Sequence, residues 1–398
     1  MTIRCKAAVL RAVGAPRPWA QSKPISIEEI NLAPPKPVEL LVRIVGAGLC
    51  HSDLSMINGD RPRPVPIGLG HEGSGEVVEV GSAIDDVRTG DHVVFQFSAS
   101  CGRCRRCLEG RPQVCERARI AKAACELMAG GSRITALNGE RIGHQLGLSC
   151  MAEYVVVDRG SVVVIDKDLP LADAALFGCA VMTGVGAVVN TARIRAGDSV
   201  AVIGLGGVGL SGILGARLAG AGTIIAIDRE PAKLEVARRV GATHAICARD
   251  ADCVEHVRDL TGGGVDYAFE LAGSAEAMTM AYALIQYGGT VVVCGLPPSS
   301  ACISVNQCDL VGQEKSIRGS FMGSCVPVRD IPRFLRLYQE GRLPVDQLID
   351  GYIGFGELNA GFDKLQDVLA IRQILRPQAA VPDRAQRTAR AVLEQVKT

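Results

Sequence analysis

A glycine-rich turn in the middle of this 398-residue chain constrains its fold more than any other feature. The turn follows the apolar run 200–203 and opens an apolar stretch, 210–218, with helical character. Such a turn between a buried strand and a helix is typical of dinucleotide-binding folds, because the glycines let the backbone approach a pyrophosphate and the helix N-terminus offers it unpaired N–H groups. The residues expected to line this site are Gly204, Gly206, Gly207, Val208 and Gly209.

The next predicted strand, 224–227, ends at Asp228. A carboxylate at this point accepts hydrogen bonds from the adenosine ribose and repels a 2′-phosphate, so we expect NAD rather than NADP. Arg229 leaves the alternative open, because an adjacent guanidinium can accommodate that phosphate.

The order of predicted strands divides the chain into domains. Short β-branched or alternating runs dominate the first 180 residues, whereas strands alternate with helices from about residue 181, as in a parallel sheet covered on both faces. We therefore expect an α/β fold with four segments: a β-rich domain over 1–180, a doubly wound Rossmann domain over 181–323, a return to the first domain over 324–377, and a C-terminal tail over 378–398.

Composition and charge limit the partners of this chain. With 43 Lys+Arg against 42 Asp+Glu, the net charge of +1 gives no reason to expect nucleic acid or an anionic membrane surface, so a small molecule is the expected partner. Charged residues interrupt the only apolar stretch near the N-terminus, which predicts no secretory signal and a cytoplasmic location. The uncharged run 199–216 has the length of a membrane span, but its glycines belong to the turn described above.

Four of the 15 cysteines lie in one short segment and form a first candidate metal site: Cys101, Cys104, Cys107 and Cys115. Cysteines so close in sequence do not easily form disulfides with each other, whereas a tight loop can aim four sulfurs at one zinc ion, at about 2.3 Å each. Four sulfur ligands leave no open position for a substrate, so this lobe, expected over 95–118, is predicted to be structural. Any reacting metal must therefore lie elsewhere.

Three dispersed residues form a second candidate metal site. Cys50 comes just after a predicted strand, His71 follows a Pro/Gly-rich turn, and Cys179 begins the link into the Rossmann domain. Together they would give zinc two sulfurs and one imidazole and leave the fourth position free, and an open zinc beside NAD predicts hydride chemistry. Taken singly, each residue is more often a buried thiol or a loop imidazole with a structural role.

These motifs, in this order, produce a family resemblance that runs from about Lys6 to Leu375. The segments that carry it are Gly70-His71-Glu72-Gly73-Ser74-Gly75, Cys50-His51-Ser52-Asp53, the lobe from Cys101 to Cys115, the turn from Gly204 to Gly209, and Asp228. The chain resembles the zinc-dependent alcohol dehydrogenases of the medium-chain dehydrogenase/reductase superfamily. The resemblance implies a GroES-like fold for the β-rich domain, two zinc ions per chain, and a homodimer or homotetramer.

The resemblance also implies roles for individual residues around the catalytic zinc. Cys50, His71 and Cys179 would hold this metal, Glu72 would lie behind it, and Asp53 would orient the imidazole of His71. The four cysteines of the lobe would hold the structural zinc.

Further positions match family residues that contact NAD. Lys233 and Arg372 match positions that contact the ribose and the pyrophosphate, and His51 matches one that lies near the pyrophosphate. His51 is therefore not expected to bind zinc.

The implied reaction is reversible oxidation of a primary alcohol, or of a secondary one, to an aldehyde or ketone by hydride transfer to NAD. Ser52 would take up the hydroxyl proton. Many relatives carry a histidine three residues later, where this chain has Ser55, so we expect the proton to leave through the cofactor ribose to solvent. Phe97 and Met151 match positions that face the alcohol, which implies an apolar pocket for a hydrophobic or aryl substituent, although both residues also suit an ordinary core.

Other functions remain as alternatives. Thiol-adduct (glutathione-type) formaldehyde dehydrogenases share both zinc sites, but Arg61 falls where they carry an acidic residue, with Asp60 one step away. A non-catalytic zinc-bearing interaction protein would keep the fold without needing the intact site. A nucleic-acid binder built on the arginines of the lobe fits the neutral chain poorly, and a zinc-free quinone reductase would need neither metal cluster.

Overall fold

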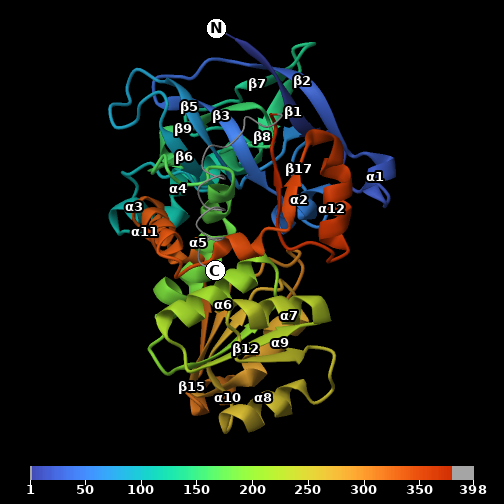
Figure 1. Ribbon diagram of the computed structural model, residues 1–398, viewed down its shortest axis with the longest axis vertical. Helices are drawn as coiled ribbons and strands as arrows, with labels where there is room; N and C mark the ends of the chain where they lie inside the picture. The colour runs from blue at the N-terminus through green and yellow to red at the C-terminus, as the bar shows by residue number, and fades with distance from the viewer. Residues whose placement is uncertain (1, 379–398) are drawn as a thin grey trace, which may run out of the picture. The chain divides into compact units, whose positions relative to one another are not determined.

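The computed structural model describes residues 2–378, so the expected tail lies outside the described residues from position 379 on. The chain divides into two compact units. The first unit comprises the residues up to Gly178 together with those from Ile349, and the second unit comprises Cys179–Leu348. Figure 1 shows the elements of each unit.

The first unit is built on a closed barrel and a seven-stranded sheet. The barrel strands, in order, are β1 (Ile3–Leu10), β2 (Ile25–Leu32), β7 (Ile134–Ala136), β8 (Arg141–His144) and β4 (Ile67–Gly68). The sheet contains β10 (Val162–Ile165), β6 (His92–Phe95), β5 (Gly73–Val80), β3 (Glu39–Gly48), β18 (Gln373–Leu375) and β17 (Gly351–Ile353), with β9 (Tyr154–Asp158) paired to β3. The β-rich interpretation of the first domain agrees with this architecture.

Short helices connect these strands. They are α1 (Trp19–Ser22), α2 (His51–Ile57), α3 (Arg105–Leu108), α4 (Glu116–Ala123) and α12 (Leu358–Gln366), together with the 3-10 turns η1 (Pro112–Val114), η2 (Gln145–Gly147), η3 (Arg159–Ser161), η4 (Asp173–Gly178) and η8 (Phe355–Glu357). The strand β3 is central, because it pairs with β5, β9 and β18 and is buried along almost its whole length. It leads directly into α2, which begins one residue after Cys50.

The second unit contains a six-stranded parallel sheet. Its strands, in spatial order, are β13 (His244–Cys247), β12 (Thr223–Asp228), β11 (Ser199–Ile203), β14 (Val265–Glu270), β15 (Ile285–Val293) and β16 (Ser316–Gly319). Numbered along the chain, this order is 3-2-1-4-5-6, the doubly wound Rossmann arrangement. The order reverses beside β11, and the carboxyl end of the strand at such a reversal is where doubly wound folds bind their ligands.

The second unit also contains helices, several of which lie beside this sheet (Figure 1). Within the second unit they are α5 (Ala180–Gly186), α6 (Gly207–Ala219), α7 (Pro231–Val240), α8 (Cys253–Thr261), α9 (Ala275–Leu284), α10 (Gln307–Gly312) and α11 (Pro327–Gln339), with a π-helical turn, η5 (Ala187–Ala192), and the 3-10 turns η6 (Met322–Ser324) and η7 (Val345–Leu348). Within residues 2–378, none of the helices has the length and apolar character needed to cross a membrane.

The expected return to the first unit at residue 324 needs correction, because residues 324–348 belong to the second unit and the return begins at Ile349. The thiol of Cys325 donates to the carbonyl of Met182 at 3.3 Å, and Asn190 donates to the carboxylate of Asp330 at 3.3 Å. These contacts tie α11 and the segment just before it to α5 and η5, so the amphipathic helix packs on its own unit instead of starting the return.

Candidate metal and dinucleotide sites

Cys50 lies between the end of β3 and the first residue of α2, and it caps that helix. Its backbone N–H donates to Oδ2 of Asp53 at 3.1 Å, and its side chain accepts from the backbone N–H of the same residue. This reciprocal capping arrangement fixes the entry of the chain into the helix. The Cys50 thiol is thereby held in a buried position at the carboxyl end of β3.

His71 is oriented by a buried carboxylate. Its Nδ1 lies 2.8 Å from Oδ1 of Asp53, and the two residues are 1% and 0% exposed. Because a carboxylate only accepts, Nδ1 carries the proton and Nε2 is the nitrogen with a lone pair to offer a metal. The predicted pairing of Asp53 with the imidazole is thus present in the geometry.

Cys179 joins this pair to complete the second cluster. It follows Gly178, which packs so tightly against β6 that an added Cβ would lie 1.9 Å from the carbonyl oxygen of Phe95. One ligand atom from each of Cys50, His71 and Cys179 lies within 4.8 Å of the others, and all three residues are buried. Two thiols and one imidazole at this spacing fit a zinc ion with one position left for a reactant.

Two buried carboxylates, those of Asp53 and Glu72, lie beside this cluster. Burial alone would lower the pKa of His71, but the charges of Asp53 and Cys50 and the hydrogen bonds to them outweigh burial and raise the pKa well above its usual value. The buried carboxylate of Glu72 packs against Gly48, where an added Cβ would lie 2.3 Å from Oε1 of Glu72, so a larger residue at position 48 would displace this carboxylate. A metal ion would supply the positive charge that the imidazole otherwise draws from a proton.

Arg372 also belongs to the surroundings of this cluster. Its guanidinium donates to the carbonyl of Leu49 at 2.7 Å and to the sulfur of Cys50 at 3.9 Å, and it lies 3.8 Å from the carboxylate of Glu72. Arg372 is only 2% exposed within the structure. The pyrophosphate contact expected for Arg372 stays a prediction, since the guanidinium is already held against the cysteine and the glutamate.

Phe97 and Met151 occupy different environments. The Phe97 ring meets the His71 ring edge-on, with centroids 5.6 Å apart and planes at 87°. Met151 is fully buried in the apolar core of the first unit, and its backbone pairs with Leu69 and Ala8. The geometry therefore supports a position beside the metal cluster for Phe97, whereas a substrate contact for Met151 stays a prediction.

Ser52, the residue proposed for proton transfer, and His51, expected near the pyrophosphate, lie on the first turn of α2. His51 is exposed and Ser52 half-buried, one and two residues after the metal candidate Cys50. The Ser55 hydroxyl donates to the backbone carbonyl of His51 at 2.9 Å, so it is occupied within the helix. Ser55 therefore does not replace the histidine that many relatives carry there.

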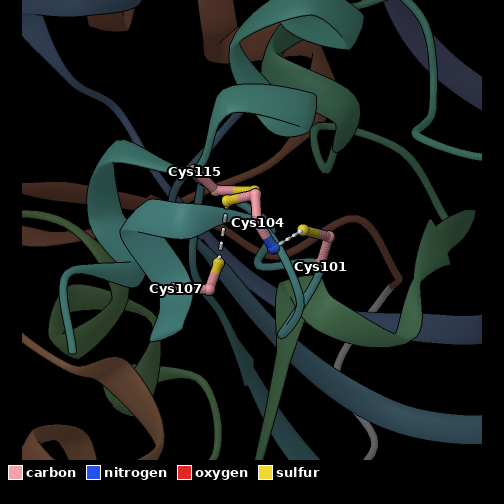
Figure 2. Close-up of side chains that lie close together, drawn as sticks. All are labelled: Cys101, Cys104, Cys107 and Cys115. Carbon is pink, nitrogen blue, oxygen red and sulfur yellow. Dashed lines mark hydrogen bonds between the residues drawn. The ribbon is translucent and has the colours of Figure 1, made fainter. Parts of the chain in front are cut away.

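The four-cysteine lobe brings its sulfurs together as expected (Figure 2). All four sulfurs lie within 4.8 Å of one another, and the Sγ of Cys104 is 3.5 Å from that of Cys107 and 3.8 Å from that of Cys115. A disulfide needs about 2.05 Å, so these are free thiols around a common centre. Backbone N–H groups of Cys107 and Glu116 lower the pKa of Cys104 to about 6, which favours the thiolate that zinc binds.

In the second unit, the glycine turn connects β11 with α6. Gly204 has a φ of +90°, and a Cβ there would lie 2.5 Å from the backbone nitrogen of Ala272, which follows β14. A Cβ on Gly209 would lie 1.8 Å from the carbonyl of Gly204. By contrast, a Cβ on Gly206 would meet no atom within 4 Å, so the backbone there is open to a ligand. Gly207 and Val208 form the first turn of α6.

Asp228 lies at the carboxyl end of β12 beside this turn. Its Oδ2 accepts from the backbone N–H of Leu205 at 2.6 Å, and its Oδ1 accepts from that of Glu230 at 3.0 Å. The Nζ of Lys233 lies 3.9 Å from Oδ2. The predicted acidic residue is thus fixed next to the glycine turn, with Lys233 beside it, and their contacts to a ribose stay a prediction.

Gln145 lies beside the metal cluster, although nothing in the sequence pointed to it. Its Nε2 donates to Oδ1 of Asp53 at 2.6 Å, the same oxygen that accepts from His71. Its Oε1 accepts from the backbone N–H of Gly70, the residue before His71. No motif spacing points to this glutamine, and only a pairing of the loop 145–151 with the segment 67–71 could have indicated it.

Two family models match this chain. The alcohol dehydrogenase GroES-like domain model matches residues 36–167, and the zinc-binding dehydrogenase model matches residues 207–340. A Mycobacterium tuberculosis protein provisionally named alcohol dehydrogenase D is 41% identical over 89% of this chain and 96% of its own length. The chain belongs to the zinc-dependent alcohol dehydrogenases of the medium-chain dehydrogenase/reductase superfamily. Zinc and a nicotinamide cofactor are therefore the groups that this dehydrogenase uses.

Two further relatives of this alcohol dehydrogenase bear on substrate. An S-(hydroxymethyl)glutathione dehydrogenase from Synechocystis is 38% identical over 89% of this chain and 96% of its own length. The crystal structure of benzyl alcohol dehydrogenase from Acinetobacter calcoaceticus is 30% identical and matches 94% of this chain and all of that one, with a TM-score of 0.87. The family resemblance seen in the sequence is thus confirmed, as is the GroES-like and Rossmann architecture.

Proposed function

We propose that this alcohol dehydrogenase oxidises a primary alcohol with NAD, using a catalytic zinc held by Cys50, His71 and Cys179. The observation that carries the proposal is the buried cluster of two thiols and one imidazole, with its ligand atoms within 4.8 Å of one another. The orientation of His71 by Asp53 supports it, because metal-binding imidazoles usually donate their other N–H to a carboxylate or carbonyl.

Zinc in this cluster would act as a Lewis acid on the alcohol oxygen, and the nicotinamide would accept the hydride. The chain's own residues orient the reactant and move the proton. Asp53 keeps the proton of His71 on Nδ1, and Arg372 keeps Glu72 in place behind the cluster. The Ser52 hydroxyl, two residues after Cys50, receives the alcohol proton and passes it toward the cofactor ribose.

NAD is the proposed cofactor. The carboxylate of Asp228 lies at the end of β12 and would accept the ribose hydroxyls, while its charge would repel a 2′-phosphate. Lys233, near Asp228, would contact the same ribose. His51 and Arg372 are proposed near the pyrophosphate, which the open backbone at Gly206 would receive.

A second zinc per chain is proposed in the four-cysteine lobe, where it would stabilise the loop without contacting substrate. The four sulfurs around one centre support this structural role, because they fill every position of a tetrahedral ion. The small apolar cluster of Ala99, Cys115 and Ala118 is too limited to hold the lobe by itself.

The proposed substrates are primary alcohols with an aryl or hydrophobic substituent. Phe97, whose ring lies edge-on against His71, gives the reaction site an apolar wall. The benzyl alcohol dehydrogenase structure with the same fold favours this class. Secondary alcohols remain within the same chemistry.

Metal analysis combined with NAD reduction over a panel of alkyl and aryl alcohols tests the proposal. We expect two zinc ions per chain in the wild type, one in Cys50→Ala, and loss of turnover in that variant. Cys5→Ala is the matched control, because Cys5 is also a buried free cysteine of the first unit. Retention of both zinc ions and of turnover in Cys50→Ala would show the assignment to be wrong.

A thiol-adduct formaldehyde dehydrogenase is the second candidate, favoured by the Synechocystis relative. Turnover of formaldehyde that strictly requires glutathione, with none on aryl alcohols, would favour this candidate. We expect thiol-independent turnover instead, because Arg61 stands where the acidic residue of that branch is expected.

We also propose a cytoplasmic homodimer or homotetramer assembled through the nucleotide-binding domain. Light scattering on the purified full chain tests the assembly, and a monomer at micromolar concentration would contradict it.

A further inference from the structure

We infer that Gln145 is a positioning residue for the proposed catalytic metal: its side-chain amide holds both Asp53 and the backbone beside His71. The inference rests on the proposed zinc site at Cys50, His71 and Cys179. It adds a residue that acts through two others and does not itself touch the metal or the substrate.

The amide of Gln145 makes two contacts around the imidazole of His71. Its Nε2 donates to Oδ1 of Asp53 at 2.6 Å, and that oxygen also accepts from Nδ1 of His71 at 2.8 Å. Its Oε1 accepts from the backbone N–H of Gly70, one residue before the imidazole. One side chain therefore fixes the group that orients the imidazole and the backbone that carries it.

The orientation of this amide is set by chemistry. The backbone N–H of Gly70 only donates, so it must face the amide oxygen of Gln145. The carboxylate of Asp53 only accepts, so it must face the NH2 group. Rotating the amide by half a turn would place like groups against each other at both contacts.

Gln145 is itself rigidly held. Its backbone N–H donates to Oγ of Ser149 at 3.0 Å, and that hydroxyl donates to the carbonyl of Gly68 at 2.8 Å. Its carbonyl accepts from the N–H of Leu148 at 2.9 Å. Only 2% of Gln145 is exposed, so water does not replace its contacts. The turn η2 thus holds the side-chain amide of Gln145 in a fixed position against Asp53 and Gly70.

A neutral donor suits this position better than a charged or apolar side chain. The carboxylates of Asp53 and Glu72 are both buried close to the cluster, so a third carboxylate would add repulsion. An apolar side chain would leave the N–H of Gly70 buried without an acceptor and remove a donor from Asp53. With the amide present, the shared oxygen of Asp53 receives two donors, which holds its position and leaves the proton on His71.

The experiment compares Gln145→Met and Gln145→Glu with wild type in the full-length protein. Metal affinity at each site is measured by chelator competition, and cobalt substituted at the catalytic site reports ligand geometry through its absorption spectrum. We expect catalytic-site zinc to bind about 10- to 100-fold more weakly in both variants, with an altered cobalt spectrum and an unchanged four-cysteine site. Gln145→Glu keeps the size of the side chain but replaces its donor with an oxygen and adds a negative charge, whereas Gln145→Met removes both polar contacts without adding a charge.

Gln96→Met is the matched control. Gln96 is a glutamine of the first unit that is 3% exposed, and its amide contacts only backbone groups, the carbonyl of Gly160 and the N–H of Ser98. We expect this variant to keep the affinity and cobalt spectrum of the catalytic site. The inference is overturned if both Gln145 variants keep wild-type affinity and spectrum, or if they lose metal equally at both sites. Failure of the proposed function has a different signature, since wild-type protein would then bind no metal that depends on Cys50.

Discussion

Oδ1 of Asp53 lies 2.8 Å from Nδ1 of His71, and both side chains are almost completely buried in the first unit. The carboxylate also accepts from the backbone N–H of Cys50, so one acidic residue organises two of the three proposed zinc ligands. Asp53 therefore acts on the cluster through its charge and its hydrogen bonds, without being one of the proposed ligands.

Replacing Asp53 with asparagine tests that charge. The amide keeps the shape and one acceptor oxygen but removes the negative charge that makes His71 a strong ligand, so catalytic-site zinc should bind about 10- to 100-fold more weakly. Chelator competition gives the affinity, and steady-state kinetics should show a parallel fall in kcat. Asp60→Asn, an exposed position of the same segment, is the control. Wild-type zinc affinity in the Asp53 variant would contradict the role assigned here.

The four-cysteine lobe should affect stability more than chemistry. In Cys107→Ser the lobe loses a ligand, and we expect one zinc per chain to be lost while the catalytic zinc remains. The melting temperature should fall by at least about 5 °C. At about 2–4 °C per kcal/mol in domains of this size, that fall corresponds to a loss of about 1.3–2.5 kcal/mol in the free energy of unfolding. Metal content and thermal unfolding measure the two effects.

Cys308→Ser supplies the comparison for the lobe, because Cys308 is an exposed free cysteine. It should keep both metals and the wild-type melting temperature. A Cys107 variant that retains its thermal stability but loses all turnover would show that the lobe takes part in the reaction.

The fold was predictable from the sequence because its decisive features are local. The glycines from Gly204 to Gly209 lie between an apolar strand and a helix, and Asp228 ends the next strand, so short stretches define the Rossmann unit. The spacing of the four cysteines in the lobe likewise predicts a metal site by itself. The dispersed set of Cys50, His71 and Cys179 needed the family resemblance as well, because no local spacing joins those residues.

Long-range contacts were not predictable. Gln145 meets Asp53 across 92 positions, and Arg372 meets Cys50 across 322, so periodicity and spacing carry no signal for either pair. The boundary at Ile349 was missed for a related reason. The apolar face of α11 predicts a buried helix side, but it does not say which unit supplies the surface that covers it.

Cofactor preference should respond to Asp228. Asp228→Asn retains an oxygen for the N–H of Leu205 but removes the charge that would repel a 2′-phosphate. Hydrogen bonds to a charged group contribute about 1.5–3 kcal/mol, so the ratio of kcat/KM for NADP to that for NAD should rise about 10- to 100-fold. Initial rates with both cofactors give this ratio. Asp250→Asn, an exposed position after β13, should leave it unchanged, and an equal ratio in both variants would exclude a ribose contact.

Acid stability should depend on His144. This residue is fully buried at the end of β8, and burial lowers its pKa to about 3. Its Nε2 accepts from the backbone N–H of Arg133 at 3.1 Å, which requires the unprotonated nitrogen. The unfolded chain protonates this histidine below about pH 6.5, whereas the native state does not until about pH 3. The unfolded state therefore binds more protons in that interval, and stability falls as the pH falls.

The contribution of His144 is about 1.4 kcal/mol per pH unit below pH 6.5. His144→Gln, whose side chain can still accept from Arg133 but does not titrate, should reduce the pH dependence of the unfolding free energy by that amount between pH 6 and pH 4. Denaturant unfolding of variant and wild type at matched pH values measures the difference, in which any acid release of metal common to both cancels. His256→Gln, at an exposed position of α8, should leave the slope unchanged. Parallel curves for wild type and His144→Gln would mean that the native state protonates this histidine as readily as the unfolded chain does.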